Sequence, residues 1–126
     1  MSAGSLPGRF LAAFVAKNGT GHFWGQRLSA IALVFLGLWF AWCLTTMSAL
    51  GYADAVEFIA APTNRVLLLM LCGALGYHSY LGVEVVIDDY VHGTRIRLVS
   101  HNLSRFAHAV IGVVAMVSIM QIGPGA

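Results

Sequence analysis

Long hydrophobic runs separated by shorter polar segments divide this chain into three parts. The runs are FWGQRLSAIALVFLGLWFAWCLTTM at residues 23–47, VLLLMLCGALGYHSYLGVEVVI at residues 66–87 and NLSRFAHAVIGVVAMVSIMQI at residues 102–122. Each reaches the length of about 20 residues with which a helix crosses the hydrocarbon core of a bilayer. In lipid every backbone polar group needs a partner within the protein, and three strands alone could not close into a barrel. The pattern therefore predicts an all-α fold with three transmembrane helices.

The composition also indicates that the bilayer is the solvent of this chain. Hydrophobic residues make up 59% and charged residues 10% of its 126 residues, whereas a soluble domain carries about a quarter charged residues. The net charge of +2 and the absence of a lysine- or arginine-rich block give no indication of nucleic acid as a partner. Cys43 and Cys72 lie in apolar runs without CxxC spacing and are predicted to be core residues. We expect a cytoplasmic segment at residues 1–22 and an anchor domain at residues 23–126.

The charges of the polar segments predict the orientation in the membrane. Basic residues precede or open the first span and lie between the second and third spans: Arg9, Lys17, Arg27, Arg95, Arg97 and Arg105. The segment between the first two spans carries Asp54 and Glu57 against Arg65. Positively charged residues remain on the cytoplasmic side of membranes. The N-terminus and the connection between spans two and three are therefore predicted to be cytoplasmic.

The second span contains titratable residues in an otherwise apolar run. On a helix at 100° per residue, His78 and Asp89 lie within about 20° of each other and about 16 Å apart along the axis. If Asp89 lies at the cytoplasmic boundary, His78 lies near the centre of the bilayer. Such a histidine is either a neutral imidazole hydrogen-bonded to a neighbouring helix or a haem or metal ligand. Gly82, one turn further on, would leave space for a flat macrocycle.

The other histidines do not provide a second ligand at a matching depth. His108 falls near the cytoplasmic end of the predicted third span, and a shift of that span by several residues would be needed to bring it to the depth of His78. We therefore expect a second subunit to supply any opposite axial ligand. His22, His92 and His101 are predicted to lie at or outside the membrane surface. Glu84 points about 120° away from His78, where it either faces a partner helix or is protonated.

Asp89 and Tyr90 lie where the second predicted span ends. The pair is either an ordinary polar helix end or a site for a lipid-soluble reactant that takes up protons, because a carboxylate relays protons and a phenol can hydrogen-bond a carbonyl oxygen. Arg27 opens the first span on the same side. Its guanidinium either reaches lipid phosphate or pairs with an acidic group such as a haem propionate.

The stretches HSYLGVEVVIDDYVHG and GHFWGQRLSAIALVFLGLWF resemble the small hydrophobic membrane anchor, a small cytochrome b chain, of succinate dehydrogenase, the succinate:quinone oxidoreductase complex. The resemblance covers about residues 19–122. It implies that His78 is an axial ligand of haem b shared with a second anchor subunit. It also implies that Tyr90 hydrogen-bonds a ubiquinone carbonyl, that Asp89 is the neighbouring acid, and that Arg27 lies near the haem propionates and the quinone. Asp88 receives no role from it.

The resemblance implies the following function. The chain would anchor succinate dehydrogenase in a bacterial inner membrane, or a mitochondrial one in a eukaryote, as part of a heteromeric helical bundle. Its expected partners are the second anchor subunit (cytochrome b), the iron–sulfur subunit, the flavoprotein subunit and the lipid bilayer. As an enzyme subunit it would help to reduce ubiquinone, while succinate and flavin would bind elsewhere. The alternatives are the anchor of a fumarate reductase that uses menaquinone, and a cofactor-free scaffold or assembly protein.

Overall fold

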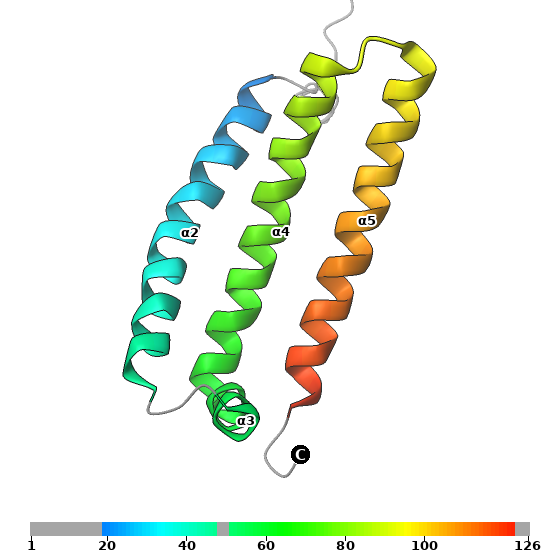
Figure 1. Ribbon diagram of the computed structural model, residues 1–126. Helices are drawn as coiled ribbons and strands as arrows, with labels where there is room; N and C mark the ends of the chain where they lie inside the picture. Colours follow the sequence, from blue (N-terminus) through cyan, green and yellow to red (C-terminus); the bar gives the residue numbers. More distant parts are fainter. Residues whose placement is uncertain (1–18, 48–50, 123–126) are drawn as a thin grey trace, which may run out of the picture.

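A computed structural model of the chain describes residues 19–47 and 51–122. These residues form four helices, α2 (Gly19–Thr46), α3 (Tyr52–Ala60), α4 (Pro62–Tyr90) and α5 (Thr94–Gln121). α2, α4 and α5 lie side by side with α4 in the middle, and the short α3 lies across the lower end of the bundle (Figure 1). α4 packs against each of the other three helices, so the bundle is built around the helix that carries His78.

The predicted all-α fold with three spans is confirmed for the part of the chain that the structure describes. Three segments are long and apolar enough to cross a membrane, namely Gly21–Thr46, Pro62–Tyr90 and Thr94–Gln121. Few apolar side chains are buried between them, and large ones such as Phe35, Trp42 and Ile111 are exposed. An outward apolar surface is what lipid tails and partner helices require. Residues 1–18 of the predicted N-terminal segment lie outside the described residues.

The helices are longer than the apolar runs from which they were predicted. α4 begins at Pro62 and ends at Tyr90, and α5 begins at Thr94 rather than at residue 102. Proline is favoured at the first position of a helix, where its missing N–H is not needed. The connection between α4 and α5 is therefore reduced to residues 91–93, and Arg95 and Arg97 belong to the first turn of α5. The expectation of a basic loop at this place was wrong, because a helix need not stop where the hydrocarbon core stops.

The short helix α3 was not predicted from the sequence. The Asp54 carboxylate accepts a hydrogen bond from the backbone N–H of Gly51, the residue before the helix, at 3.2 Å, and so satisfies a donor that the helix leaves open. On the other side, the ring of Phe58 stacks on that of Trp39 in α2, with 6.1 Å between the ring centroids. This contact ties α3 to the end of α2.

Arg65 joins three helices at the same end of the bundle. Its guanidinium donates to the backbone oxygens of Ile59 at 3.4 Å and Ala60 at 3.1 Å, near the end of α3. It also donates to the backbone oxygen of Ile122, directly after α5. Terminal carbonyls have no partner within their own helix, and a cation near them is favourable. Arg65 thus fixes α3 and α5 to the first turn of α4.

α2 and α4 approach each other closely at Gly25. A Cβ atom at this position would lie 2.6 Å from the hydroxyl oxygen of Tyr77 and 3.3 Å from Cδ1 of Leu81. Leu81 is one of the few buried apolar residues of the bundle. The absence of a side chain at Gly25 therefore lets α2 approach α4 one turn away from the polar contacts of His78.

Candidate functional site

The imidazole of His78 faces α2 and is held there by polar side chains. Its Nδ1 lies 2.9 Å from Oγ of Ser29, which is buried, and its Nε2 lies 3.4 Å from Nε2 of Gln26. The Ser29 hydroxyl donates its single proton to a backbone oxygen of its own helix, that of Gly25 at 2.8 Å or that of Gln26 at 3.1 Å. Its oxygen then accepts from Nδ1–H of His78. This arrangement favours the tautomer whose lone pair is on Nε2.

That tautomer fits the requirement of an axial haem ligand. A histidine that binds a metal through one nitrogen usually donates the proton of the other to a fixed acceptor. At 3.4 Å the Gln26 amide makes a long contact with Nε2, and its Oε1 is buried without a hydrogen-bond partner among the described residues. A Cβ at Gly82 would lie 3.8 Å from the same amide. Gln26 is therefore the side chain that would have to move for a ligand to reach Nε2.

The described residues include no group of three or more histidine, cysteine, aspartate and glutamate side chains that could hold a metal ion. A haem does not require three ligating side chains from one chain. Its macrocycle supplies the equatorial ligands, and a single imidazole can fill one axial position. With Nδ1 in contact with Ser29, Nε2 is the nitrogen of His78 that could fill such a position.

His108 lies at the same depth as His78 but on the other side of α4. Its Nε2 is 3.1 Å from Oγ of Ser79, the residue after His78, and its Nδ1 is 2.8 Å from the backbone oxygen of Ser104. The expectation that His108 lies near the cytoplasmic end of its span was wrong, because α5 begins at Thr94. His78 contacts α2 and His108 contacts Ser79 and its own helix, so the two imidazoles do not face a common space.

Arg27 lies close to the level of His78. It precedes Ser29 by two residues, about 3 Å along the helix axis, and its guanidinium lies over the Phe23 ring at 4.9 Å from the centroid. The sequence predicted that Arg27 opens the first span on the same side as Asp89. Because α2 begins at Gly19, Arg27 lies about 12 Å along the axis from the first residue of that helix.

Asp89 and Tyr90 are the last two residues of α4. Both side chains are exposed, and Tyr90 is 77% accessible. They lie at the end of the bundle where α2 begins and α5 begins, as Figure 1 shows. The structure thus brings the predicted residues into one half of the bundle, with His78 partly buried, Arg27 exposed on α2, and Asp89 and Tyr90 at the end of α4.

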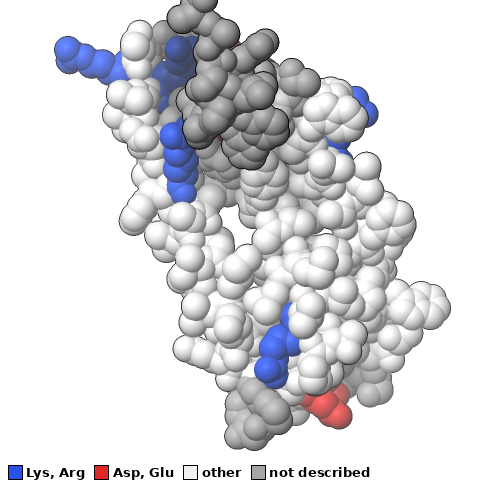
Figure 2. All heavy atoms as spheres, turned by 180° about the vertical axis from the view of Figure 1, so that it is seen from behind, with Lys and Arg blue, Asp and Glu red and all other residues white. Residues whose placement is uncertain are grey.

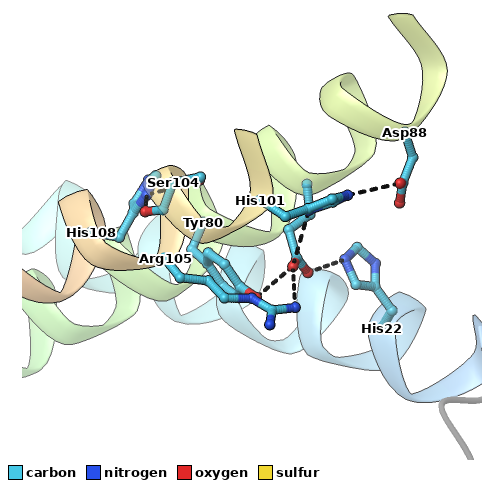
Figure 3. A network of polar contacts seen from close by, with 8 residues as sticks. His22, Tyr80, Asp88, His101, Ser104, Arg105 and His108 are labelled. Atoms are coloured by element: carbon cyan, nitrogen blue, oxygen red, sulfur yellow. Dashed lines mark hydrogen bonds and ion pairs between the residues drawn. The ribbon is translucent and has the colours of Figure 1, made fainter. Parts of the chain in front are cut away.

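A second polar cluster, which the sequence reading did not find, surrounds Glu84 (Figure 3). Glu84 is only 8% accessible. Its Oε1 accepts from the Tyr80 hydroxyl and from Arg105 Nη2 at 3.1 Å, and lies 3.5 Å from Nδ1 of His101. Its Oε2 lies 3.9 Å from Nε2 of His22 in α2. We refer to Glu84, its contacts His22, Tyr80, His101 and Arg105, and Asp88, which binds His101, as the Glu84 cluster.

Two sequence-based expectations are corrected by this cluster. His22 and His101 were predicted to lie at or outside the membrane surface, yet the His101 side chain is only 18% accessible and both rings face Glu84. His92, by contrast, is exposed as predicted. The signal for the cluster was present as helical spacing. Tyr80, Glu84 and Asp88 repeat every four residues in α4, and His101 and Arg105 do so in α5, which places each set on one helix face.

The fold and the site together define a three-span membrane protein with polar groups gathered in one half of an apolar bundle. Residues 8–120 match the model of the family of succinate dehydrogenase and fumarate reductase transmembrane subunits, and the chain belongs to this family. It is similar to the succinate dehydrogenase hydrophobic membrane anchor subunit of Rickettsia bellii, with 32% identity over 65% of this chain and 66% of the relative. The succinate dehydrogenase membrane anchor subunit of Reclinomonas americana is 30% identical over 71% of this chain and 77% of the relative. The resemblance inferred from the sequence is thereby confirmed.

Proposed function

We propose that this chain is the membrane anchor subunit of a succinate dehydrogenase. In this role it holds haem b through His78 and forms, with Tyr90 and Asp89, part of the site at which ubiquinone is reduced by electrons from the iron–sulfur subunit. The observation that carries the proposal is the orientation of His78, whose Nδ1 is tied to Ser29 at 2.9 Å. The family match over residues 8–120 supports the same function.

His78, Ser29 and Arg27 would form the haem-binding part of the site. Ser29 fixes the imidazole plane and keeps the Nε2 lone pair available, and Arg27, close to the same depth, pairs with a propionate. When bound, the haem supplies a site inside the membrane that accepts and returns single electrons. The second axial ligand comes from the other anchor subunit, because His108 faces away from His78.

Tyr90 and Asp89 would form this chain's part of the quinone site. The Tyr90 phenol donates a hydrogen bond to a carbonyl oxygen of the quinone and orients the ring. The Asp89 carboxyl, exposed at the helix end, passes protons from water to the reduced oxygen. The remaining contacts come from the second anchor and from the iron–sulfur subunit, from which the electrons arrive.

The distribution of charge supports a cytoplasmic position of this end. In Figure 2 most of the basic side chains lie at the upper end of the bundle, and the acidic side chains visible on this face lie at the lower end. Basic residues favour the cytoplasmic side. The end with Tyr90 and Asp89 then faces the cytoplasm, or the matrix in a mitochondrion, where the iron–sulfur and flavoprotein subunits dock. The relatives from Rickettsia and Reclinomonas fit a bacterial or mitochondrial inner membrane.

The anchor of a fumarate reductase is a second candidate, because the matching family includes both enzymes. The curated relatives are named as subunits of succinate dehydrogenase, which favours the first. The identity of the quinone that co-purifies with the complex distinguishes them. A cofactor-free scaffold would instead give a colourless complex that retains all its subunits.

The test is the His78→Ala variant in a complex purified through a tag on this chain. Mass spectrometry of the co-purified chains should identify an iron–sulfur subunit, a flavoprotein and a second anchor. The reduced-minus-oxidised spectrum should show a b-type band in the unmodified complex and none in His78→Ala.

His108→Ala is the matched control, since it removes an imidazole at the same depth on the other side of α4. It should retain the band. A b-type band of full height in His78→Ala, with the subunits assembled, would remove His78 from the haem site.

A further inference from the structure

Glu84 is a buried carboxylate for which the proposed function has no use. It lies six residues after His78 and six before Tyr90 on α4, so it is about 9 Å along the axis from each. Titratable side chains from all three long helices face it: His22 from α2, Tyr80 from α4, and His101 and Arg105 from α5, while Asp88 of α4 contacts His101. Placing ionisable groups inside a membrane protein costs free energy, so a buried cluster of this kind indicates a functional role.

Two of these groups hold Glu84 in place. Arg105 donates from Nη2 to Oε1 at 3.1 Å and from Nε to the Tyr80 hydroxyl oxygen at 3.1 Å, while that hydroxyl donates to the same Oε1. A buried carboxylate is tolerated when it is paired and hydrogen-bonded in this way. The second carboxylate oxygen, Oε2, is left facing His22.

His101 connects Glu84 to the end of the bundle. Its Nε2 lies 2.9 Å from Oδ1 of Asp88, and its Nδ1 lies 3.5 Å from Oε1 of Glu84. Nδ1 is buried and makes no hydrogen bond among the described residues. The Asp88 side chain is 57% accessible, whereas that of Glu84 is 10% accessible. An imidazole with a carboxylate at each nitrogen can take a proton on one side and release it on the other.

His22 connects Glu84 to the face that carries His78. It precedes Gln26 by four residues in α2, so the two side chains lie on the same face of that helix. Gln26 in turn contacts His78 at 3.4 Å. The groups therefore cross the bundle, from Asp88 and His101, through Glu84, to His22 between α2 and α4. The 3.5 Å and 3.9 Å separations on either side of Glu84 are closed by a small carboxylate rotation or by one water molecule.

We propose that Asp88, His101, Glu84 and His22 form a proton-transfer line that runs from the water-exposed end of α4 through the buried Glu84 to His22 in the first turn of α2, at the same end of the bundle as Tyr90 and Asp89 (Figure 1). This inference rests on the proposed function, in which a quinone takes up two electrons from the iron–sulfur subunit and two protons to give a hydroquinone. His22 gives one of these protons to a quinone oxygen and is reprotonated by Glu84. Glu84 is then reprotonated by His101, and His101 takes up a proton from water through Asp88. The second proton comes from Asp89.

The test compares the pH dependence of quinone reduction by the purified complex with and without Glu84→Gln. Glutamine retains the size of the side chain and can still contact Tyr80 and Arg105, but it carries no exchangeable carboxyl proton. Near pH 6 protons are abundant and the two rates should lie within about twofold of each other. Above about pH 8.5 the kcat of Glu84→Gln should fall about tenfold below that of the unmodified complex, within the usual range for a lost proton-transfer group, with KM for the quinone unchanged. His101→Gln should give the same profile.

Two controls separate proton transfer from damage to the fold. His92→Gln removes an exposed histidine at the same end that is outside the line, and its profile should match that of the unmodified complex. Succinate oxidation with a water-soluble electron acceptor, which bypasses the quinone site, should be unchanged in all variants. Added imidazole or acetate should restore part of the alkaline rate of Glu84→Gln. If the kcat of Glu84→Gln fell by the same factor at every pH, or did not fall at any pH, the inference would be overturned.

A second variant provides the test if the complex that carries Glu84→Gln does not assemble. Asp88 is exposed, so Asp88→Asn leaves the buried contacts of Glu84 in place and should slow the alkaline rate in the same direction. If the unmodified complex reduces quinone and the variants show the same pH dependence of the rate, the proton-transfer line is refuted and the proposed function is not. An unmodified complex without quinone reduction refutes the proposed function itself.

Discussion

His78 in α4 and Ser29 in α2 are joined by a contact of 2.9 Å between the imidazole Nδ1 and the hydroxyl oxygen. Ser29 is one of the few buried polar residues of a bundle whose outer surface is almost entirely apolar. Since the Ser29 hydroxyl can donate to its own helix, the contact favours the tautomer whose lone pair is on Nε2. It also lies one turn from Gly25, where α2 approaches Tyr77 and Leu81 of α4 closely. Packing and ligand orientation are therefore coupled at one level of the bundle.

Replacement of Ser29 by alanine should weaken haem binding without removing the ligand. The imidazole would lose the acceptor that holds Nδ1–H, and loss of such a supporting hydrogen bond typically costs about 10- to 100-fold in metal affinity. The haem content of the purified complex, measured by pyridine haemochrome absorbance against protein, checks this. Ser118→Ala is the control, because the Ser118 hydroxyl donates to the Val114 oxygen of its own helix at 2.8 Å. Equal haem content in both variants would contradict the role given to Ser29.

Replacement of Gly25 by alanine should push α2 and α4 apart. The new methyl group would meet the Tyr77 hydroxyl at 2.6 Å and Leu81 Cδ1 at 3.3 Å. Tyr77 is half exposed and can swing away, but Leu81 is buried, so we expect a loss of about 1–3 kcal/mol, the usual cost of overpacking. Thermal unfolding of the purified complex followed by the b-type band provides the measurement.

Gly37→Ala is the matched control for Gly25→Ala. A Cβ at Gly37 would have no atom of the described residues within 4 Å beyond its own helix backbone and chain neighbours, and alanine favours a helix interior by about 0.5–1 kcal/mol over glycine. Its midpoint of unfolding should therefore stay level or rise. If Gly25→Ala and Gly37→Ala changed the midpoint of unfolding by the same amount, the close approach of α2 to α4 would not explain the lost stability of Gly25→Ala.

The length of the apolar runs was sufficient to predict the three spans, but it did not predict where the helices end. Residues 94–101 are too polar to count as hydrocarbon-spanning, yet they are helical, because backbone hydrogen bonding continues wherever the chain geometry allows it. The nine residues of α3 contain too short an apolar pattern to stand out beside runs that span a bilayer.

The candidate site was predictable only where a polar residue interrupts an apolar run. His78 was found for this reason, and its partner Ser29 was not, because a serine in a membrane helix carries no such signal. The Glu84 cluster was missed for another reason. Its members come from three helices, and no pattern within one helix tells which face meets which neighbour. The roles of Arg27, Asp89 and Tyr90 stay predictions, since they depend on groups outside this chain.

Removal of Arg105 should leave the Glu84 carboxylate without its main partner. Arg105→Leu takes away the contacts to Oε1 of Glu84 and to the Tyr80 hydroxyl. The Arg105 side chain is 50% accessible, but its loss leaves the buried Glu84 carboxylate without a cation, which is more harmful than replacing both partners. We expect Arg105→Leu to lower the unfolding temperature of the complex, and the double variant Glu84→Gln/Arg105→Leu to recover most of the loss. Arg97→Leu, at an exposed position of the same helix, should change little. Additive losses in the double variant would show that the two side chains do not stabilise each other.

Replacement of Tyr90 by phenylalanine should impair quinone reduction while the haem remains bound. The variant removes one hydroxyl from an exposed ring at the end of α4, so the fold has no reason to change. A hydrogen bond to the quinone carbonyl contributes about 0.5–1.5 kcal/mol, which corresponds to a loss of up to about tenfold in kcat/KM. Steady-state assays with a short-chain ubiquinone provide the measurement, and the height of the b-type band serves as the internal standard. Tyr52→Phe is the matched control, because Tyr52 is an equally exposed tyrosine at the opposite end of the bundle. If Tyr52→Phe lowered kcat/KM as much as Tyr90→Phe, or if neither did, the quinone would not bind at the end of α4 in the way proposed.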